Sequence, residues 1–186
     1  MNISSKIVTL EHSSNKNLKK INYEKEKKMR VETKRWGLTE EELHTEIQLN
    51  TLYLINDKDN DKDKDLEKDK YQSTIISHIK TKITGYKQQD IFKKKLDESN
   101  FVSFNEVIKL LQDCLLKCHY CSEDIFILYE RVREMKQWTL DRIDNDKGHN
   151  TGNVLISCLE CNLKRRRTNK DAFMFTKNLV ITREGL

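Results

Sequence analysis

The chain has 186 residues, no proline and a formal net charge of +5 at pH 7, and 35% of its residues are charged. Its apolar share is only 36%, which predicts that part of the chain lies outside any packed core. No apolar run is long enough for a signal peptide or a membrane helix, so we expect no membrane partner. Residues 71–186 carry the basic excess, with 20 Lys and Arg against 15 Asp and Glu. This excess favours a polyanionic partner.

The first 70 residues divide into three segments. Residues 1–38 are polar and charged, and we predict a poorly ordered N-terminal segment, most of it a solvated tail rather than a nucleic-acid arm. Residues 39–56 are predicted to form a helix that begins with a capping box between Thr39 and Glu42. Residues 57–70, DKDNDKDKDLEKDK, are low in complexity and predict a flexible charged linker, because they bury too little surface to offset ordering.

Residues 71–117 are predicted to be a helical region that packs on the module after it. Gly85 is expected to end a short helix or strand before it, and the polar residues 86–90 suit either a helix surface or DNA contacts. Ser103 and Glu106 form a second capping box. The helix that it starts presents apolar residues at helical spacing, which predicts a core face made of Phe104, Val107, Ile108, Leu111 and Leu115.

Four of the five cysteines form two CxxC pairs, Cys118 with Cys121 and Cys158 with Cys161. Paired CxxC knuckles are typical of a tetrahedral zinc site, and four thiolates leave no open position, so this zinc would be structural. The alternatives are two unrelated CxxC pairs or a redox pair, but a redox pair is expected beside a βαβ pattern, which is not visible here. Cys114 is the odd cysteine and is predicted to be a buried thiol. Free cysteines without a secretory signal favour an intracellular, reducing compartment.

The segment from Trp138 to Arg167 reads as strand, turn-rich loop, strand and basic helix. Residues 138–140 are extended and half-apolar, and residues 144–152 consist almost entirely of turn formers. Residues 154–156 are rich in β-branched side chains, which indicates a second strand. A helical pattern begins at Leu159.

The order LDRID, GHN, NVLIS and CLECN, followed by basic residues, resembles the HNH (His-Me finger, ββα-metal) endonucleases. The match covers about residues 118–170, and the zinc-knuckle variants found in phage and giant-virus nucleases are most similar. The resemblance implies an α+β protein, with a ββα-metal module at 118–186 stapled by a four-cysteine zinc site and preceded by helical and disordered charged segments. It also implies a metal-dependent DNA endonuclease that uses Mg²⁺ or Mn²⁺. A viral or phage-encoded protein acting in a host cell would fit this family.

The same resemblance implies roles for individual residues. Asp141 stands where the family has a metal-binding acid, and Asn162 stands where it has the second metal ligand on the helix. Asn153 matches the asparagine that ties down the loop between the strands. The family's general base, a His directly after the acid, is replaced here by Arg142. Sub-groups with DRxD in place of DH exist in the family.

The general base must therefore be sought elsewhere in the motif. His149 is the only histidine there, and the ordinary pKa of histidine suits proton transfer at neutral pH. Asp144 is the second candidate, whereas Arg142 stays protonated and is predicted to bind a phosphate or to stabilise the transition state. The basic residues at the end of the motif predict a clamp on the DNA backbone rather than a merely solvated face; they are Lys164, Arg165, Arg166 and Arg167.

Two other functions are compatible with the sequence. Arg142 in place of histidine is compatible with a zinc module that binds DNA without cutting it. A zinc-stapled protein-interaction domain would explain the knuckles but not the acid and amide beside a basic helix. The choice between DNA and RNA, the specificity of cleavage and the oligomeric state are not predicted.

Overall fold

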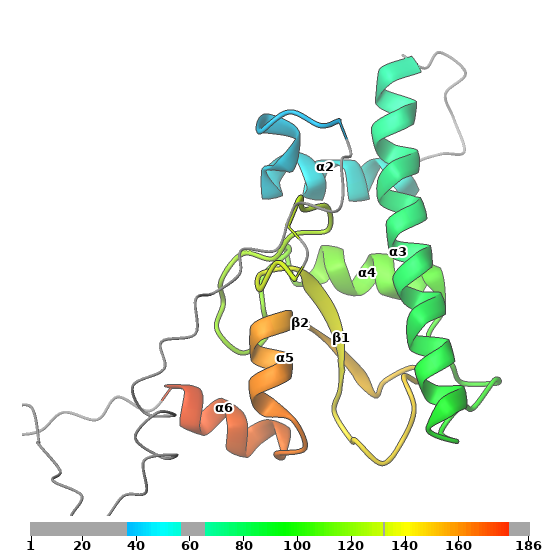
Figure 1. Ribbon diagram of the computed structural model, residues 1–186, viewed down its shortest axis with the longest axis vertical. Coiled ribbons are helices and arrows are strands. Elements are labelled where there is room, and N and C mark those ends of the chain that lie inside the picture. Colours follow the sequence, from blue (N-terminus) through cyan, green and yellow to red (C-terminus); the bar gives the residue numbers. More distant parts are fainter. Residues whose placement is uncertain (1–36, 57–65, 132, 179–186) are drawn as a thin grey trace, which may run out of the picture. The chain divides into compact units, whose positions relative to one another are not determined.

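The computed structural model describes residues 37–56, 66–131 and 133–178, all within one compact unit; the predictions for residues 1–36 and 57–65 lie outside these ranges. The elements are η1 (Glu41–Leu43), α2 (Thr45–Asn56), α3 (Leu66–Phe92), α4 (Phe104–Asp113), β1 (Trp138–Arg142), β2 (Val154–Cys158), α5 (Leu159–Arg165) and α6 (Lys170–Asn178) (Figure 1). Helices thus combine with a two-stranded antiparallel sheet, which confirms the α+β class. No helix in the described ranges is long and apolar enough to cross a membrane.

The predicted capping box at the start of the described chain is present. The Thr39 N–H donates to Glu42 Oε2 at 2.7 Å, and the Glu42 N–H donates to Thr39 Oγ1 at 3.3 Å. The turn that it starts is the short η1, and α2 begins separately at Thr45. Gln48 of α2 is fully buried, and its Oε1 accepts from the N–H groups of Ile127 and Leu128. The amide side chain of Gln48 therefore accepts hydrogen bonds from buried backbone N–H groups that do not belong to a strand.

Helix α3 is longer than the sequence indicates. It runs without a break through Gly85, so the predicted break there is wrong. It also begins at Leu66, so the charged linker ends earlier than the predicted residue 70. One helical glycine costs only about 1 kcal/mol relative to alanine. Burial of side chains such as Ile75 and Ile79 offsets that cost, because each is worth roughly 1.5–3 kcal/mol.

Helix α4 follows its prediction except at the C-terminal end. Ser103 caps it by accepting from the Glu106 N–H at 3.2 Å, while the Glu106 carboxylate accepts from Thr151 Oγ1 instead of closing the box. Val107, Ile108 and Leu111 are buried as predicted. Leu115 is 56% exposed and Leu116 is buried in its place. The helix ends at Asp113, so helical spacing no longer applies to these two leucines.

The two strands pair from Trp138 opposite Cys158 to Arg142 opposite Val154. Two side chains of helix α3 form hydrogen bonds with backbone groups of β1. The Tyr86 hydroxyl accepts from the Leu140 N–H at 3.1 Å, and Lys82 Nζ donates to the Trp138 carbonyl at 2.6 Å. A strand edge left open would otherwise expose unpaired backbone groups. These contacts bring the C-terminal end of α3 to the predicted motif.

Candidate functional site

The four CxxC cysteines converge in space. Cys118 and Cys121 lie in the turn after α4, Cys158 ends β2, and Cys161 lies in the first turn of α5. Their four Sγ atoms lie within 4.8 Å of one another, and the Sγ atoms of Cys121 and Cys158 are 3.9 Å apart. A tetrahedral zinc with Zn–S bonds of about 2.3 Å requires sulfurs about 3.8 Å apart. The cluster can therefore hold a metal ion such as zinc.

Backbone N–H groups point at the sulfurs of this cluster. Cys118 Sγ accepts from the N–H of Tyr120 at 3.4 Å and of Cys158 at 3.3 Å, and Cys158 Sγ accepts from the Cys161 N–H at 3.3 Å. A hydrogen bond from the Cys158 thiol, with help from these N–H groups, lowers the pKa of Cys118. The bonds to Cys118 favour its thiolate, which is the form that binds metals, whereas the same contact raises the pKa of Cys158.

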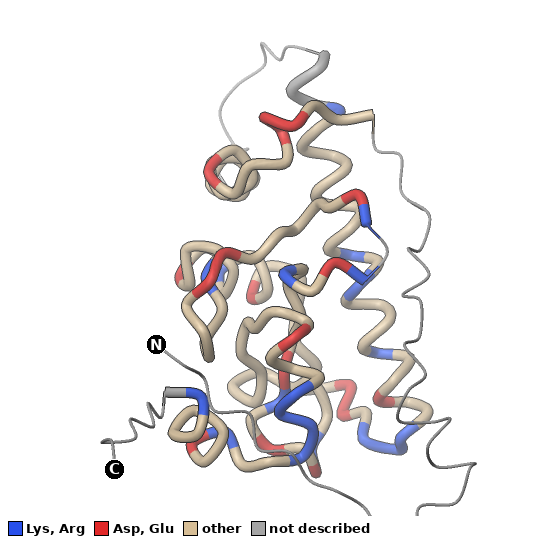
Figure 2. The backbone as a smooth tube through the Cα atoms, turned by 60° about the vertical axis from the view of Figure 1, so that its left-hand side comes forward, with Lys and Arg blue, Asp and Glu red and all other residues tan. Residues whose placement is uncertain are grey.

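A pocket of about 740 Å³ collects four of the five predicted catalytic residues. Asp141, Arg142, His149 and Asn162 all line it. Its remaining walls come from α3, the turn after α3 and α5. Among the described residues that line it, Asp141 is the only acid, whereas six are basic: Lys82, Lys93, Lys95, Arg142, Arg166 and Arg167. Figure 2 shows two of the basic runs, at the ends of α3 and α5, close together. The pocket therefore favours a polyanion.

His149 is held by a carboxylate from helix α3. Asp90 is fully buried, and its Oδ1 and Oδ2 lie 2.9 and 3.0 Å from Nδ1 of His149. The same carboxylate accepts from the His149 backbone N–H at 2.6 Å. The Tyr86 ring packs on the imidazole with centroids 4.6 Å apart. The sequence did not indicate Asp90, because an acid within an expected helix surface carries no local signal of burial.

The surroundings of His149 keep its imidazole neutral. Burial lowers the pKa of His149 below its ordinary value, and the nearby charges of Arg142 and Lys93 lower it further. The Asp90 carboxylate raises the pKa but does not outweigh burial. A neutral imidazole is the form that can accept a proton.

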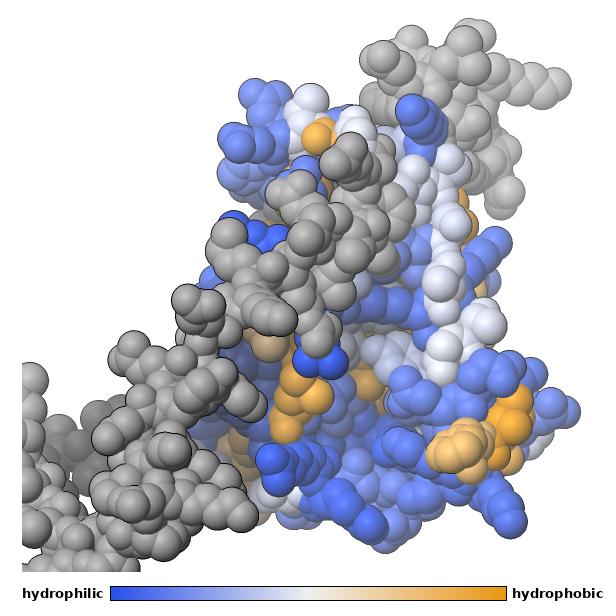
Figure 3. All heavy atoms as spheres, in the orientation of Figure 1, coloured by the Kyte–Doolittle hydropathy of each residue, from blue (hydrophilic) through white to orange (hydrophobic). Residues whose placement is uncertain are grey.

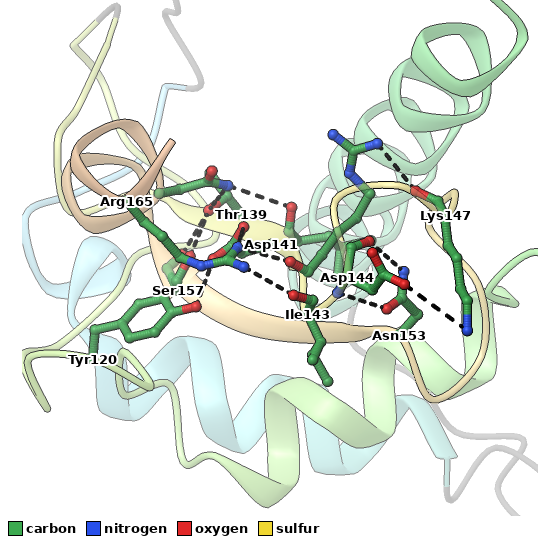
Figure 4. Close-up of polar contacts among 12 residues, drawn as sticks. Tyr120, Thr139, Asp141, Ile143, Asp144, Lys147, Asn153, Ser157 and Arg165 are labelled. Atoms are coloured by element: carbon green, nitrogen blue, oxygen red, sulfur yellow. Dashed lines mark hydrogen bonds and ion pairs between the residues drawn. The ribbon is translucent and has the colours of Figure 1, made fainter. Parts of the chain in front are cut away.

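Asp141 is buried and engaged on both oxygens (Figure 4). The Tyr120 hydroxyl donates to Oδ2 at 2.7 Å, and Arg165 donates to Oδ1 at 2.7 Å. Arg165 also donates to the carbonyls of Arg142 and Ile143. Burial raises the pKa of Asp141, and the bonds from Tyr120 and Arg165 oppose that rise. Arg165, predicted as part of a DNA clamp, is 1% exposed and instead joins α5 to the end of β1.

Asn162 leaves one polar atom available to the pocket. Its Nδ2 donates to Thr139 Oγ1 at 3.1 Å and to the Leu140 carbonyl at 3.4 Å. No residue that the structure describes donates a hydrogen bond to its Oδ1. That amide oxygen suits a hard divalent cation. Asp141 fits the same cation only through the lone pairs that Tyr120 and Arg165 leave unused.

Asn153 bonds the backbone of the loop between the strands (Figure 4). Its Oδ1 accepts from the Asp144 N–H at 2.9 Å, and its Nδ2 donates to the carbonyls of Asp144 and Gly148. Asp144 is exposed, and its Oδ1 accepts from the Asp146 N–H at 2.9 Å. Asp144 does not line the pocket, so the structure brings His149 there and not the second candidate base.

The four basic residues at the end of α5 are separated in space. Lys164 is exposed and pairs with Glu160 one turn away, and it does not line the pocket. Arg166 and Arg167 do line it, and Arg167 also pairs with Asp146 across 3.0 Å. Only these two of the four are placed to contact a ligand in the pocket.

An apolar patch lies beside the pocket, at the C-terminal end of α3 (Figure 3). Ile91 is 47% exposed and Phe92 is 87% exposed. Lys93, which follows directly, and Lys95 line the pocket. An exposed aromatic ring beside lysines is a common element of surfaces on which nucleobases stack.

Comparisons with protein-family models, with curated proteins and with solved structures found no match. The resemblance to HNH endonucleases therefore rests on the sequence motif alone.

Proposed function

We propose that this protein is an HNH-like nuclease that hydrolyses phosphodiester bonds in DNA. The observation that carries the proposal is the composition of the pocket. A buried histidine held by a carboxylate lines it together with an acid, an amide and six basic side chains. These groups supply the base, the cation ligands and the phosphate contacts that phosphodiester hydrolysis requires.

Five of the lining residues have roles in proton transfer or phosphate binding in this proposal. The attacking water gives its proton to His149. The Arg142 guanidinium, whose side chain is 13% exposed, binds a phosphate oxygen near that histidine. Lys93, Arg166 and Arg167 contact neighbouring phosphates and set the position of the strand.

Two metals belong to the proposal. Zinc bound by the four cysteines would be structural, because a thiolate from each fills all four positions. Asp141 and Asn162 would hold Mg²⁺ or Mn²⁺, and such an ion supplies charge stabilisation to the phosphate and to the leaving oxygen. The reducing compartment and the viral setting stay predictions.

A second function, DNA binding without cleavage, is favoured by one observation. The acid that would bind the catalytic metal is already neutralised by Arg165 and accepts from Tyr120. If that ion pair persists with DNA bound, no cation enters and the basic pocket only binds. Arg142 at the position of the family's base points the same way.

Nicking of supercoiled plasmid by the purified protein tests the two functions. We expect Mg²⁺- or Mn²⁺-dependent nicking that EDTA abolishes. His149→Ala should reduce the rate by at least about 10²-fold, the usual contribution of a positioned base. Asn162→Ala should also reduce the rate, because it removes a ligand of the cation. Asp141→Asn should also reduce it, and its fold should be checked because Asp141 is buried.

The control compares two variants of neighbouring basic residues. Lys164 lies in α5, and Arg166 directly follows that helix. Arg166→Ala should weaken plasmid binding and reduce its salt dependence, because Arg166 lines the pocket. Lys164→Ala should change neither, because Lys164 lies outside the lining of the pocket. Salt-dependent binding without nicking, with either metal and with branched or single-stranded substrates, would establish the second function instead.

A further inference from the structure

We infer that Asp90 and His149 form a carboxylate–imidazole pair in which Asp90 positions His149 as the proton acceptor. The inference rests on the proposed function and deepens it. It adds Asp90, a residue of helix α3. Asp90 lies 59 positions before His149 and outside the HNH-like segment. The active site would therefore include α3 as well as the ββα module.

The geometry of the pair is closely constrained. One carboxylate of a fully buried side chain receives both the backbone N–H and the ring Nδ1 of His149. Gly148 makes this approach possible, since a Cβ at that position would lie 2.9 Å from Asp90 Oδ2 and 2.5 Å from the Lys95 carbonyl. The Tyr86 ring covers the imidazole from the α3 side. The histidine is thus fixed in position and in ring orientation.

These contacts determine the tautomer of the neutral ring. An ionised carboxylate can only accept, so Nδ1 must carry the proton. The Nε2 lone pair is then free. Among the residues described, none forms a hydrogen bond with Nε2, and His149 lines the pocket. The free nitrogen is the atom that a general base needs.

Charged and polar groups from α3, from the turn after it and from β1 surround the ring. From α3 and the turn after it come Asp90, Lys93 and the Tyr86 hydroxyl, and from β1 comes Arg142, whose guanidinium lies 4.0 Å from Asp90 Oδ1. Burial and the two cations keep the ring neutral before reaction. Asp90 stabilises the imidazolium that forms during reaction. The pair is thus arranged for proton uptake.

The step is balanced without a further reactant. The attacking water forms a bond from its oxygen to phosphorus, and the O–H bond that breaks leaves its proton on His149 Nε2. The bond between phosphorus and the leaving oxygen breaks with its electron pair, and that oxygen takes a proton from solvent. Asp90 stays ionised throughout and does not itself accept the proton.

Asp90→Asn tests the pair because it is nearly isosteric and reverses the tautomer. The asparagine amide would donate to Nδ1, so the proton of the neutral ring moves to Nε2 and the lone pair is lost. In hydrolases that use a histidine–aspartate pair, this change costs about 10⁴-fold in kcat. We expect a loss of at least about 10³-fold in the nicking rate with KM and plasmid affinity unchanged. Asp113→Asn, at an exposed position at the end of α4, should have no effect.

The second readout does not depend on nuclease activity. Ring ¹⁵N chemical shifts of histidine-labelled, full-length protein report the tautomer of His149. We expect the Nδ1–H form in the wild type and the Nε2–H form in Asp90→Asn. An Nε2–H form in the wild type would overturn the inference, whether or not the variant folds. So would a variant that keeps the wild-type rate.

The two proposals fail in different ways. If the wild type shows the Nδ1–H tautomer but nicks no substrate with either metal, the nuclease proposal fails and the base role falls with it. If the wild type nicks and the tautomer is Nε2–H, the nuclease proposal stands and the role of Asp90 is overturned.

Discussion

The Tyr120 hydroxyl donates a hydrogen bond to Asp141 Oδ2 across 2.7 Å. Tyr120 lies between the two cysteines of the first knuckle, and Asp141 lies near the end of β1. The contact therefore joins the cysteine cluster directly to the pocket, and the ring of Tyr120 also packs on Phe173 of α6. Metal bound to the cysteines would order Tyr120 and, through it, the carboxylate of Asp141.

Replacement of one cysteine of the cluster should abolish zinc binding and lower the stability of the fold. We expect about one zinc per chain in the wild type and none in Cys158→Ala, measured by metal analysis after gel filtration. Thermal unfolding of Cys158→Ala should occur at a clearly lower temperature, because the folding free energy of such sites includes metal binding. Cys114→Ser should retain its zinc, since Cys114 does not belong to the cluster. Equal zinc content in both variants would contradict the assignment.

The Asp141–Arg165 ion pair predicts how the free energy of unfolding should differ between single and double variants. Both side chains are buried, so Arg165→Met should lower the free energy of unfolding by about 3–5 kcal/mol, because it leaves a buried carboxylate without its charged partner. The double variant Arg165→Met with Asp141→Leu should recover much of the loss, because no uncompensated charge remains. Urea unfolding of the three proteins measures the effect. A double variant no more stable than Arg165→Met would show that the charge is not the cause.

Two glycines should respond to alanine in opposite directions. A Cβ at Gly148 would lie 2.5 Å from the Lys95 carbonyl, so Gly148→Ala should destabilise by about 1–3 kcal/mol and displace His149 from Asp90. Gly85 has open space around its position within α3, so Gly85→Ala should stabilise by about 0.5–1 kcal/mol. Chemical denaturation measures both. The prediction fails if Gly148→Ala is as stable as the wild type.

The lowered pKa of His149 predicts how stability depends on pH. The unfolded chain binds a proton at about pH 6.5, whereas the folded protein binds it only at lower pH. The free energy of unfolding should therefore fall as pH falls from about 6.5 to the folded pKa, by up to about 1.4 kcal/mol per pH unit. Above about pH 6.5 His149 is neutral in both states, and its contribution to the free energy of unfolding is fully present. His149→Gln should remove it, so the difference between the two proteins should depend on pH over that interval and not above it.

The exposed ring of Phe92 is predicted to contact unpaired nucleobases. If nucleobases stack on its exposed ring, Phe92→Ala should weaken binding to single-stranded DNA by about 1–3 kcal/mol per stacked base. Binding to a fully paired duplex should change less. Phe175→Ala is the matched control, because Phe175 on α6 is 69% exposed and does not line the pocket. Equal losses for both variants, measured by fluorescence anisotropy, would argue against stacking at α3.

Local patterns determined several features of this protein. The β-branched run at 154–156 and the switch to helical spacing at Leu159 correspond to β2 and α5. Capping-box spacing located the turn at Thr39 and the start of α4 at Ser103. The two CxxC pairs indicated a shared metal cluster. The strand, helix and capping predictions depend on side chains a few residues apart. The metal prediction depends on paired cysteines, a ligand pattern that is typical of zinc sites.

The tertiary structure alone decided which residues meet. Asp90 and His149 are 59 residues apart, and nothing in the local sequence marks Asp90 as buried. Arg165 sits within four successive basic residues, yet it is the one that packing against β1 turns inward to Asp141. Helix α3 passes through Gly85 because long-range burial outweighs a local cost. Such pairings depend on how elements pack, and local periodicity does not contain that information.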